Sequence, residues 1–217
     1  CSYCGTVNRN VAIGHCAGKK LSSQQWSCTY SNVLIGHNVG AAATSIHQTV
    51  LIGEGAGKCI SSGGAAGSSV GPNVAVGDQA MVYRTMGAAN VAMGFGALGG
   101  TNAGKSNVAI GDNAFQYLKY GGNQDYCNIG VGGHVGAALT TGIQNVFLGS
   151  QSGYNKTSGN NNIAIGHMSQ FPTATGNNEL VIGYGTNYWL RGDSSYNICT
   201  QGNMCATCFF GCGAGLT

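Results

Sequence analysis

The sequence predicts an all-β fold, a parallel β-roll or narrow β-helix solenoid. A five-residue phrase, N-V-A-I-G or a close variant, occurs ten times. In most cases the glycine that closes one copy is 17 residues from the glycine that closes the next, as Gly36 is from Gly53. Self-similarity at a fixed period, here about 17 residues, indicates stacked structural repeats. Three of the nine intervals are longer, which indicates inserted loops. The closing glycines of the phrases are Gly14, Gly36, Gly53, Gly77, Gly94, Gly111, Gly132, Gly149, Gly166 and Gly183.

Each phrase is rich in β-branched residues and precedes turn residues such as HCAG or EGAG, which predicts one short strand ending at a corner glycine. A turn of about 17 residues is too short for a crossover helix, so the connections must be strands and tight turns. At about 4.8 Å per stacked strand, ten turns form a rod of about 45 to 50 Å. We expect a cysteine-containing cap at 1–9, the solenoid at 10–188 and a cysteine-rich segment at 189–217.

Side chains alternate between the two faces of a strand, so the phrase separates into two sets. We expect the second and fourth residues, such as Val108 and Ile110, to fill the inside of the coil. The third residue would then face outward, and because it is never polar we expect an interface between copies. The alternative is that loops cover this face. The expected interface residues are Ala12, Leu34, Leu51, Ala75, Ala92, Ala109, Phe147, Ala164 and Val181.

The first position of the phrase is Asn in eight of the ten copies, with Thr49 and Glu179 as the exceptions. Stacked asparagines can form amide ladders from one turn to the next. We therefore expect a structural role for this column rather than a binding role.

Composition excludes several classes of partner. Only 7% of the residues are charged and 39 of the 217 are Gly, which is typical of a rigid fibre rather than an ordinary globular domain. The nine basic residues are scattered, so we expect no nucleic acid partner, and no long apolar run predicts membrane insertion. Because the chain begins with Cys rather than Met and shows no signal peptide, we expect a processed chain or a fragment.

Ten cysteines gather mainly near the two ends. Disulfides, free buried thiols and a metal site are all compatible with the spacing, and we favour disulfides because neither C-x-x-C pair has a histidine nearby. Cross-linked ends would protect the terminal turns of a solenoid, or join neighbouring subunits. The disulfide candidates are Cys1, Cys4, Cys199, Cys205, Cys208 and Cys212.

The sequence shows no cluster of acids and bases, so we expect no catalytic, cofactor-binding or metal-binding residues and no enzymatic activity. His15, His37 and His167 share the position after the corner glycine, where we expect exposed histidines without a metal. Arg191-Gly192-Asp193 matches an integrin-binding tripeptide, and Asn155-Lys156-Thr157 matches a glycosylation acceptor, but matches this short arise by chance.

The extended phrase, as in NVAIGDNAF, NVAMGFGAL and NVAVGDQAM, resembles the head repeats of trimeric autotransporter adhesins and the related repeats of phage and viral fibre proteins. The segment NELVIGYGTNYWLRGDSSYNI is similar to the end of such arrays. The resemblance covers residues 10 to about 198 and implies a left-handed roll, three chains around one axis and a role in surface attachment. The longer period and the many cysteines depart from that pattern.

The leading hypothesis is a non-enzymatic, homotrimeric fibre or adhesin on a virion or cell surface, with a host glycan or protein as receptor. The inserted loops would carry binding, because insertions leave the core intact. The alternatives are a self-assembling extracellular filament or coat subunit with Cys-linked ends, and a β-solenoid carbohydrate-active enzyme. The aromatic candidates for binding are Trp26, Tyr30, Tyr117, Tyr120 and Tyr126.

Overall fold

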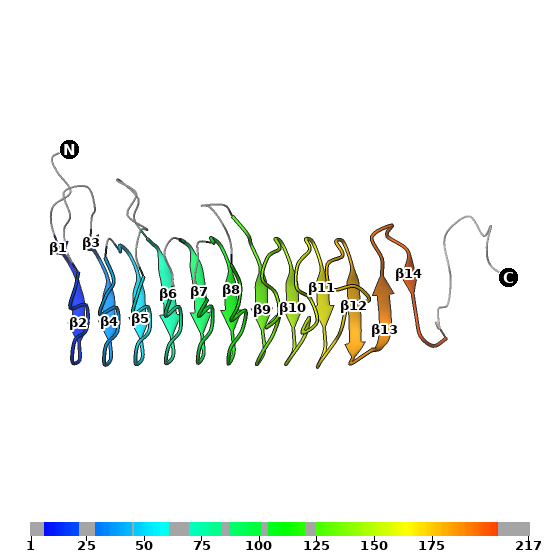
Figure 1. Cartoon of the computed structure of the whole chain (residues 1–217), viewed down its shortest axis with the longest axis horizontal. Coiled ribbons are helices and arrows are strands. Elements are labelled where there is room, and N and C mark those ends of the chain that lie inside the picture. Colours follow the sequence, from blue (N-terminus) through cyan, green and yellow to red (C-terminus); the bar gives the residue numbers. More distant parts are fainter. Residues whose placement is uncertain are drawn as a thin grey trace.

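The computed structural model describes residues 7–21, 29–44, 46–60, 70–83, 87–100, 104–119 and 125–203. Within these ranges the chain is all-β, without a helix, and winds into a parallel β-solenoid (Figure 1). This confirms the predicted fold class. The candidates Trp26, Tyr120, Cys1, Cys4, Cys205, Cys208 and Cys212 lie outside the described residues.

Ten strands, one from each phrase, stack in parallel along the rod (Figure 1). Equivalent residues are in register, so that Val91, Val108 and Ile129 are consecutive partners. The insertions between phrases therefore leave the stacking unchanged. The strands are β2 (Val11–Ile13), β4 (Val33–Ile35), β5 (Val50–Ile52), β6 (Asn73–Val76), β7 (Asn90–Met93), β8 (Val108–Ile110), β9 (Ile129–Val131), β10 (Val146–Leu148), β11 (Ile163–Ile165) and β12 (Leu180–Tyr184).

Two antiparallel strands follow the parallel stack. β13 (Asn187–Gly192) turns back along β12, and β14 (Ile198–Cys199) pairs with β13 at the C-terminal edge of the sheet. The expected boundary between residues 188 and 189 therefore falls inside β13. At the other end, β1 (Val7–Asn8) and β3 (Thr29–Tyr30) form a separate two-stranded parallel sheet.

The corner glycines allow neighbouring turns to touch. Gly36, Gly53 and Gly77 have φ between 126° and 138°, a region that favours glycine. An added Cβ at each would lie 2.6 Å from the carbonyl oxygen of the next corner glycine. The backbone therefore turns at this corner only if no side chain is present.

The inside of the roll is filled by the third residue of each phrase, and the expected orientation was wrong. Leu34, Leu51, Ala92, Ala109 and Phe147 have no exposed surface. Ala75, Ala164 and Val181 are also buried, whereas Ala12, in the first strand of the stack, is exposed. Alternation identifies two faces but not which one is interior. The coil encloses a narrow space, in which third residues as different in size as Ala92 and Phe147 are accommodated by changes elsewhere in the turn.

In six of the turns, a large side chain occupies one of two interior positions and a small residue the other. Where the third residue is Ala75, Ala92 or Ala109, the fourth residue after the corner glycine is Met81, Leu98 or Phe115, each buried. Where the third residue is Leu34, Leu51 or Phe147, the corresponding residue is Gly40, Gly57 or Gly153. A Cβ at Gly57 would lie 2.6 Å from a methyl group of Leu51. The two positions thus fill one space between them, at the close packing of protein interiors.

The predicted asparagine ladder is confirmed. In the run Asn90, Asn107, Asn128, Asn145 and Asn162, each side-chain Oδ1 accepts from the backbone N–H and the Nδ2 of the next at 2.9 to 3.1 Å. These side chains are buried. The ladder satisfies polar groups that burial would otherwise leave unpaired.

Candidate functional site

The outer face of the sheet is an apolar surface made by the second and fourth residues of the ten phrases. Every one of these side chains is half-buried or exposed, for example Met93 at 41% and Ile163 at 40%. We call it the outer apolar face. Its members are Val11, Ile13, Val33, Ile35, Val50, Ile52, Val74, Val76, Val91, Met93, Val108, Ile110, Ile129, Val131, Val146, Leu148, Ile163, Ile165, Leu180 and Ile182.

The outer apolar face extends onto the antiparallel strands. Residues directly opposite in an antiparallel pair lie on the same face. Leu190 is opposite Ile182, and Ile198 is opposite Gly192, which in turn is opposite Leu180. The sequence does not reveal this face, because both sides of each phrase are apolar, and the same residues were expected in the core.

A buried ion pair closes the C-terminal end of the core. Lys156, which is fully buried, donates to Oε2 of Glu179 at 2.5 Å and to the carbonyl of Thr173 at 3.2 Å. Its ammonium lies 4.5 Å from the centre of the Phe171 ring. Thr173 Oγ1 donates to Oε1 of Glu179 at 2.8 Å. Burial lowers the pKa of Lys156, and the hydrogen bond and charge of Glu179 partly offset that effect.

Glu179 occupies the last position of the asparagine column, where its backbone N–H donates to Asn162 Oδ1 at 2.9 Å. Unlike Asn, its carboxylate accepts but cannot donate, so Lys156 and Thr173 supply the donors. The ion pair therefore terminates the ladder, and it is buried where a substrate could not reach it.

The predicted binding aromatics lie in different environments. Tyr117 is 53% exposed, while Tyr30 is 37% exposed and stacks on His47 with ring centres 5.5 Å apart. Tyr126 is only 7% exposed and belongs to the core cluster, so its assignment as a binding residue was wrong. It follows the third insertion, where the chain re-enters the stack, and burial of its ring anchors that re-entry.

The cysteines that the structure describes carry free thiols. Cys199 is exposed on β14, and Cys16, Cys59 and Cys127 lie on separate turns. No disulfide joins any of these four. The other disulfide candidates are outside the described ranges, as stated above.

The position after the corner glycine forms an exposed corner column. His15 stacks on His37 with ring centres 5.4 Å apart, and His37 Nδ1 lies 3.1 Å from Glu54 Oε1. His167 stacks in the same way on Tyr184 at 5.4 Å. In the described part of the chain, no group of three or more His, Cys, Asp or Glu is placed to hold a metal ion. Exposed pairs of this kind contribute little to stability.

The Arg-Gly-Asp match is built into secondary structure. Arg191 belongs to β13 and stacks over the Tyr188 ring at 5.1 Å. Asp193 accepts hydrogen bonds from the backbone of Ser195 and Asn197 and from the Asn197 side chain at 2.9 to 3.0 Å. The Asn197 bonds hold the pKa of this carboxyl below its usual value. Arg191 therefore packs against its own strand, and Asp193, directly after β13, holds together the turn that leads to β14.

A pocket of about 350 Å³ lies between this hairpin and the outer apolar face. Ile163, Leu180 and Ile198 form its apolar lining, and Asp193 and Tyr196 contribute polar groups. It is continuous with the outer apolar face, because Ile163 and Leu180 belong to both.

The glycosylation match also has a structural explanation. Asn155 donates to the Phe171 carbonyl at 2.7 Å and accepts from the Phe171 N–H at 3.0 Å. Its amide thereby fixes the aromatic residue that packs on Lys156.

Within the described ranges, no helix is long and apolar enough to cross a membrane.

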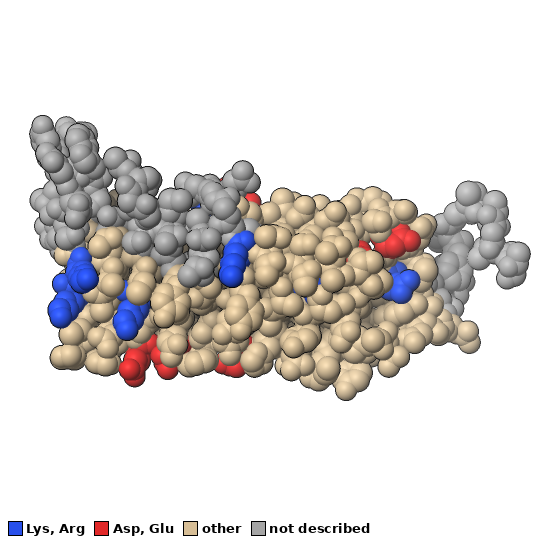
Figure 2. Space-filling model, in the orientation of Figure 1, with Lys and Arg blue, Asp and Glu red and all other residues tan. Residues whose placement is uncertain are grey.

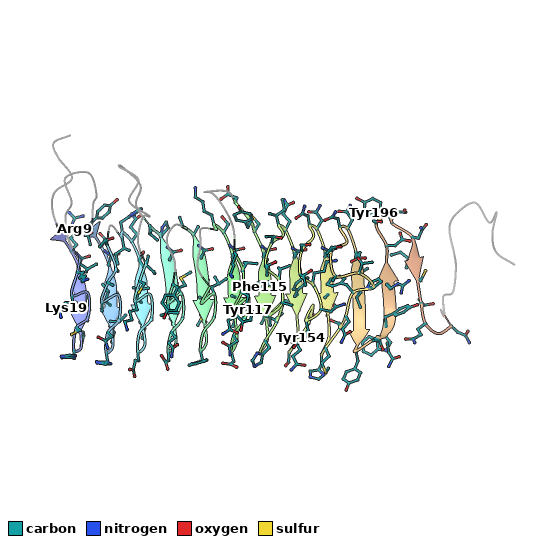
Figure 3. The ribbon with its side chains drawn as sticks, in the orientation of Figure 1. Arg9, Lys19, Phe115, Tyr117, Tyr154 and Tyr196 are labelled. Atoms are coloured by element: carbon teal, nitrogen blue, oxygen red, sulfur yellow. The ribbon has the colours of Figure 1, made fainter. Side chains whose placement is uncertain are left out.

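A second surface follows each corner, exposed for the most part, although Val82, Ala137 and Phe171 within it are buried. We call it the tyrosine flank and define it as the fifth and sixth residues after each corner glycine. Tyr83, Tyr117 and Tyr154 lie there at 54%, 53% and 51% exposure, and Figure 3 shows Tyr117 and Tyr154 following one another along the rod. The sequence analysis selected Tyr117 as a loop residue and missed the other two. Counting from the corner glycine would have revealed them, since Tyr83 and Tyr117 share the sixth position and Tyr154 occupies the fifth.

Comparison of the chain with family models, with curated proteins and with solved structures finds no match.

Proposed function

We propose that this chain is a non-enzymatic structural fibre or adhesin, a homotrimer displayed on a virion or cell surface as a rigid stalk or receptor-binding element. The observation that carries the proposal is the outer apolar face, which runs along all ten stacked strands. Soluble monomers rarely expose a contiguous apolar patch of more than a few hundred Å². Twenty aliphatic side chains in one continuous face exceed that limit.

The outer apolar face suits association with copies of the same chain. Its residues stack in register along a straight rod, so identical faces can meet along their whole length. Closed rotational symmetry brings such faces together around one axis and leaves none exposed. The resemblance of the repeats to trimeric fibre heads favours three copies. The proposed interface replaces the one expected from the third residues, which are buried within each chain.

Two pairs of neighbouring positions test the interface. Val108→Glu combined with Val91→Glu places charges on the outer face, and we expect a folded monomer of 21.9 kDa by light scattering, where the natural chain gives a trimer. Ala109→Glu combined with Ala92→Glu places the same charges in the core, and we expect loss of the β-sheet signal in circular dichroism. A natural chain that is monomeric at micromolar concentration would contradict the trimer.

Surface display is tested separately. Antibodies raised against the folded chain should label intact particles or cells by electron microscopy, without permeabilisation. Labelling only after permeabilisation would contradict a role in attachment.

A further inference from the structure

The tyrosine flank carries a regular pattern of side chains. Along the described turns its residues, in order, are Lys19 and Lys20, Ala41 and Ala42, Lys58 and Cys59, Val82 and Tyr83, Gly99 and Gly100, Gln116 and Tyr117, Ala137 and Ala138, Tyr154 and Asn155, and Phe171 and Pro172. The first and third pairs contribute lysines, and the fourth, sixth and eighth each contribute one exposed tyrosine.

The backbone holds the tyrosine flank in register. The residue just before the flank is the fourth after the corner glycine, and its backbone N–H donates to a backbone carbonyl of the next turn. The donor and acceptor residues are Met81 and Ala97, Leu98 and Ala114, Phe115 and Val135, and Gly136 and Ser152, at 2.9 to 3.0 Å. Equivalent positions are therefore about 4.8 Å apart along the rod. Tyr83 and Tyr117 occupy the same position two turns apart, so their rings are roughly 10 Å apart along the rod. Tyr154 lies two turns further on, one residue earlier in its turn.

Small residues separate the tyrosines. Gly99 and Gly100 lie between Tyr83 and Tyr117, and Ala137 and Ala138 lie between Tyr117 and Tyr154. Each ring therefore has, on at least one side, a neighbouring turn without a bulky side chain at the flank positions, which leaves room for a flat ligand against the ring. A tyrosine presents an apolar ring together with a hydroxyl that can hydrogen-bond, a combination that suits a sugar ring.

The charges on the tyrosine flank have one sign. Lys19, Lys20 and Lys58 are exposed there, and no Asp or Glu occupies any of its positions in the described turns. Glu54, Asp78 and Asp112 lie directly after the corner glycines instead. Figure 2 shows the basic side chains along the visible flank of the N-terminal half and acidic ones along its lower edge. This separation favours an anionic ligand on the flank.

We propose that the tyrosine flank binds an extended, β-linked polysaccharide that carries carboxylate groups, lying along the rod. The spacing of Tyr83 and Tyr117, roughly 10 Å, is close to the length of a disaccharide unit in an extended β-1,4-linked chain, so alternate sugars can stack on these two rings. Tyr154 offers a third ring two turns further along the same surface. Carboxylates of the same chain pair with the lysines of the first and third turns. This proposal names the ligand of the attachment function proposed above and rests on it.

Titration calorimetry with defined oligosaccharides tests the proposal on the full chain. The probes are a hexamer and a dimer of β-1,4-linked mannuronate and a neutral hexamer of β-1,4-linked glucose. We expect the uronate hexamer to bind at least about tenfold more tightly than either of the others, because only it reaches two rings and carries charge. Its affinity should fall as salt is added. Equal affinity for the neutral hexamer would overturn the electrostatic part, and no binding of the uronate hexamer would overturn the site.

Variants locate the site. Tyr117→Ala and Tyr154→Ala should each weaken binding of the hexamer about fivefold or more, while Tyr117→Trp retains it. Tyr184→Ala is the matched control, since Tyr184 is also exposed, at 60%, but lies directly after a corner glycine. Unchanged affinity in both alanine variants, or an equal loss in the control, would refute the assignment. The oligomer mass is measured on the same samples: a monomer that binds refutes only the trimer, and a trimer that does not bind refutes only this site.

Discussion

Phe115 and Phe147 meet inside the roll across a turn that contributes no side chain to the space between them. Their ring centres are 5.9 Å apart at an interplanar angle of 52°. The intervening turn has Gly130 as its third residue and Gly136 as the fourth residue after its corner. Built side chains at those glycines would collide with Phe115. The two rings thus occupy the space that the glycines of the intervening turn leave open, beside Val135 and Leu139 of that turn. A large residue in one turn can therefore compensate for small residues in the next.

The first prediction follows from this contact. Gly136 has a φ of +54°, and a Cβ there would enter the space of the Phe115 ring. We expect Gly136→Ala to lower the free energy of unfolding by about 2 to 4 kcal/mol, from overpacking and backbone strain together. Gly133→Ala in the same turn is the control, because only Ser150 Oγ lies within 4.0 Å of a Cβ there. Urea denaturation should separate the two variants, and equal stabilities would refute the packing argument.

The second prediction concerns the asparagine ladder. Asn145 donates from Nδ2 to Asn128 Oδ1 and to the Gly159 carbonyl, and its Oδ1 accepts from Asn162. Asn145→Ala removes these bonds and leaves buried partners unpaired, so we expect a loss of about 2 to 4 kcal/mol in urea denaturation. Asn161→Ala is the control, since Asn161 is exposed and makes one amide contact with Asn178. Its φ of +58° adds backbone strain of about 1 kcal/mol to the alanine variant, so the comparison is a stringent one. A loss at Asn145 no greater than that at Asn161 would contradict a structural ladder.

The third prediction separates the buried ion pair from its surroundings. Lys156→Leu leaves Glu179 buried without its cation, and we expect a loss of about 3 to 5 kcal/mol. The double variant Lys156→Leu, Glu179→Asn restores residues that other turns use, since Leu118 and Leu139 occupy the position of Lys156 and Asn that of Glu179. Its stability should return to within about 1 kcal/mol of the natural chain. Failure of the second change to rescue the first would show that the end of the core requires the pair itself.

The fourth prediction concerns the stability of the fold at mildly acidic pH. Burial lowers the pKa of His47 below its ordinary value of 6.5, and its Nδ1 is buried without a hydrogen bond. Between 6.5 and the lowered pKa, the unfolded chain binds a proton that the folded chain does not, so this contribution to stability is complete above pH 6.5 and declines as the pH falls. Melting temperatures measured from neutral to mildly acidic pH should show a smaller decline for His47→Gln than for His167→Gln. Identical declines would exclude His47 as the source.

Much of the fold was predictable because the repeat itself encodes it. The position of every stacked strand, the corner glycines and the amide ladder follow from residues that recur in each phrase. The orientation of the strands does not, because both faces of the phrase are apolar. Ala109 and Val108 are both apolar, and the side that faces inward is completed by buried residues outside the phrase, such as Phe115. One phrase alone therefore does not reveal the orientation.

The C-terminal hairpin and the tyrosine flank escaped prediction for different reasons. The segment from Leu180 to Gly192 holds two β-rich runs around Tyr184 and Gly185, which is a hairpin signal, but the expectation of one more parallel turn concealed it. The tyrosines of the flank lie outside the repeated five-residue phrases. Only counting from the corner glycine places Tyr83 and Tyr117 at the same position, and Tyr154 one residue earlier.

The in-register stacking also determines how the rod responds to force. Hydrogen bonds between stacked strands point along the rod, so tension applied to the two ends of a single chain loads the bonds of the outermost turn first. Each regular turn that detaches releases about 17 residues, which extend to roughly 55 Å. Under such a load an isolated chain should lengthen in equal steps, with longer ones wherever an insertion interrupts the period. Copies bound along the outer apolar face would resist that peeling, because each turn would have to leave its neighbours as well as its own stack.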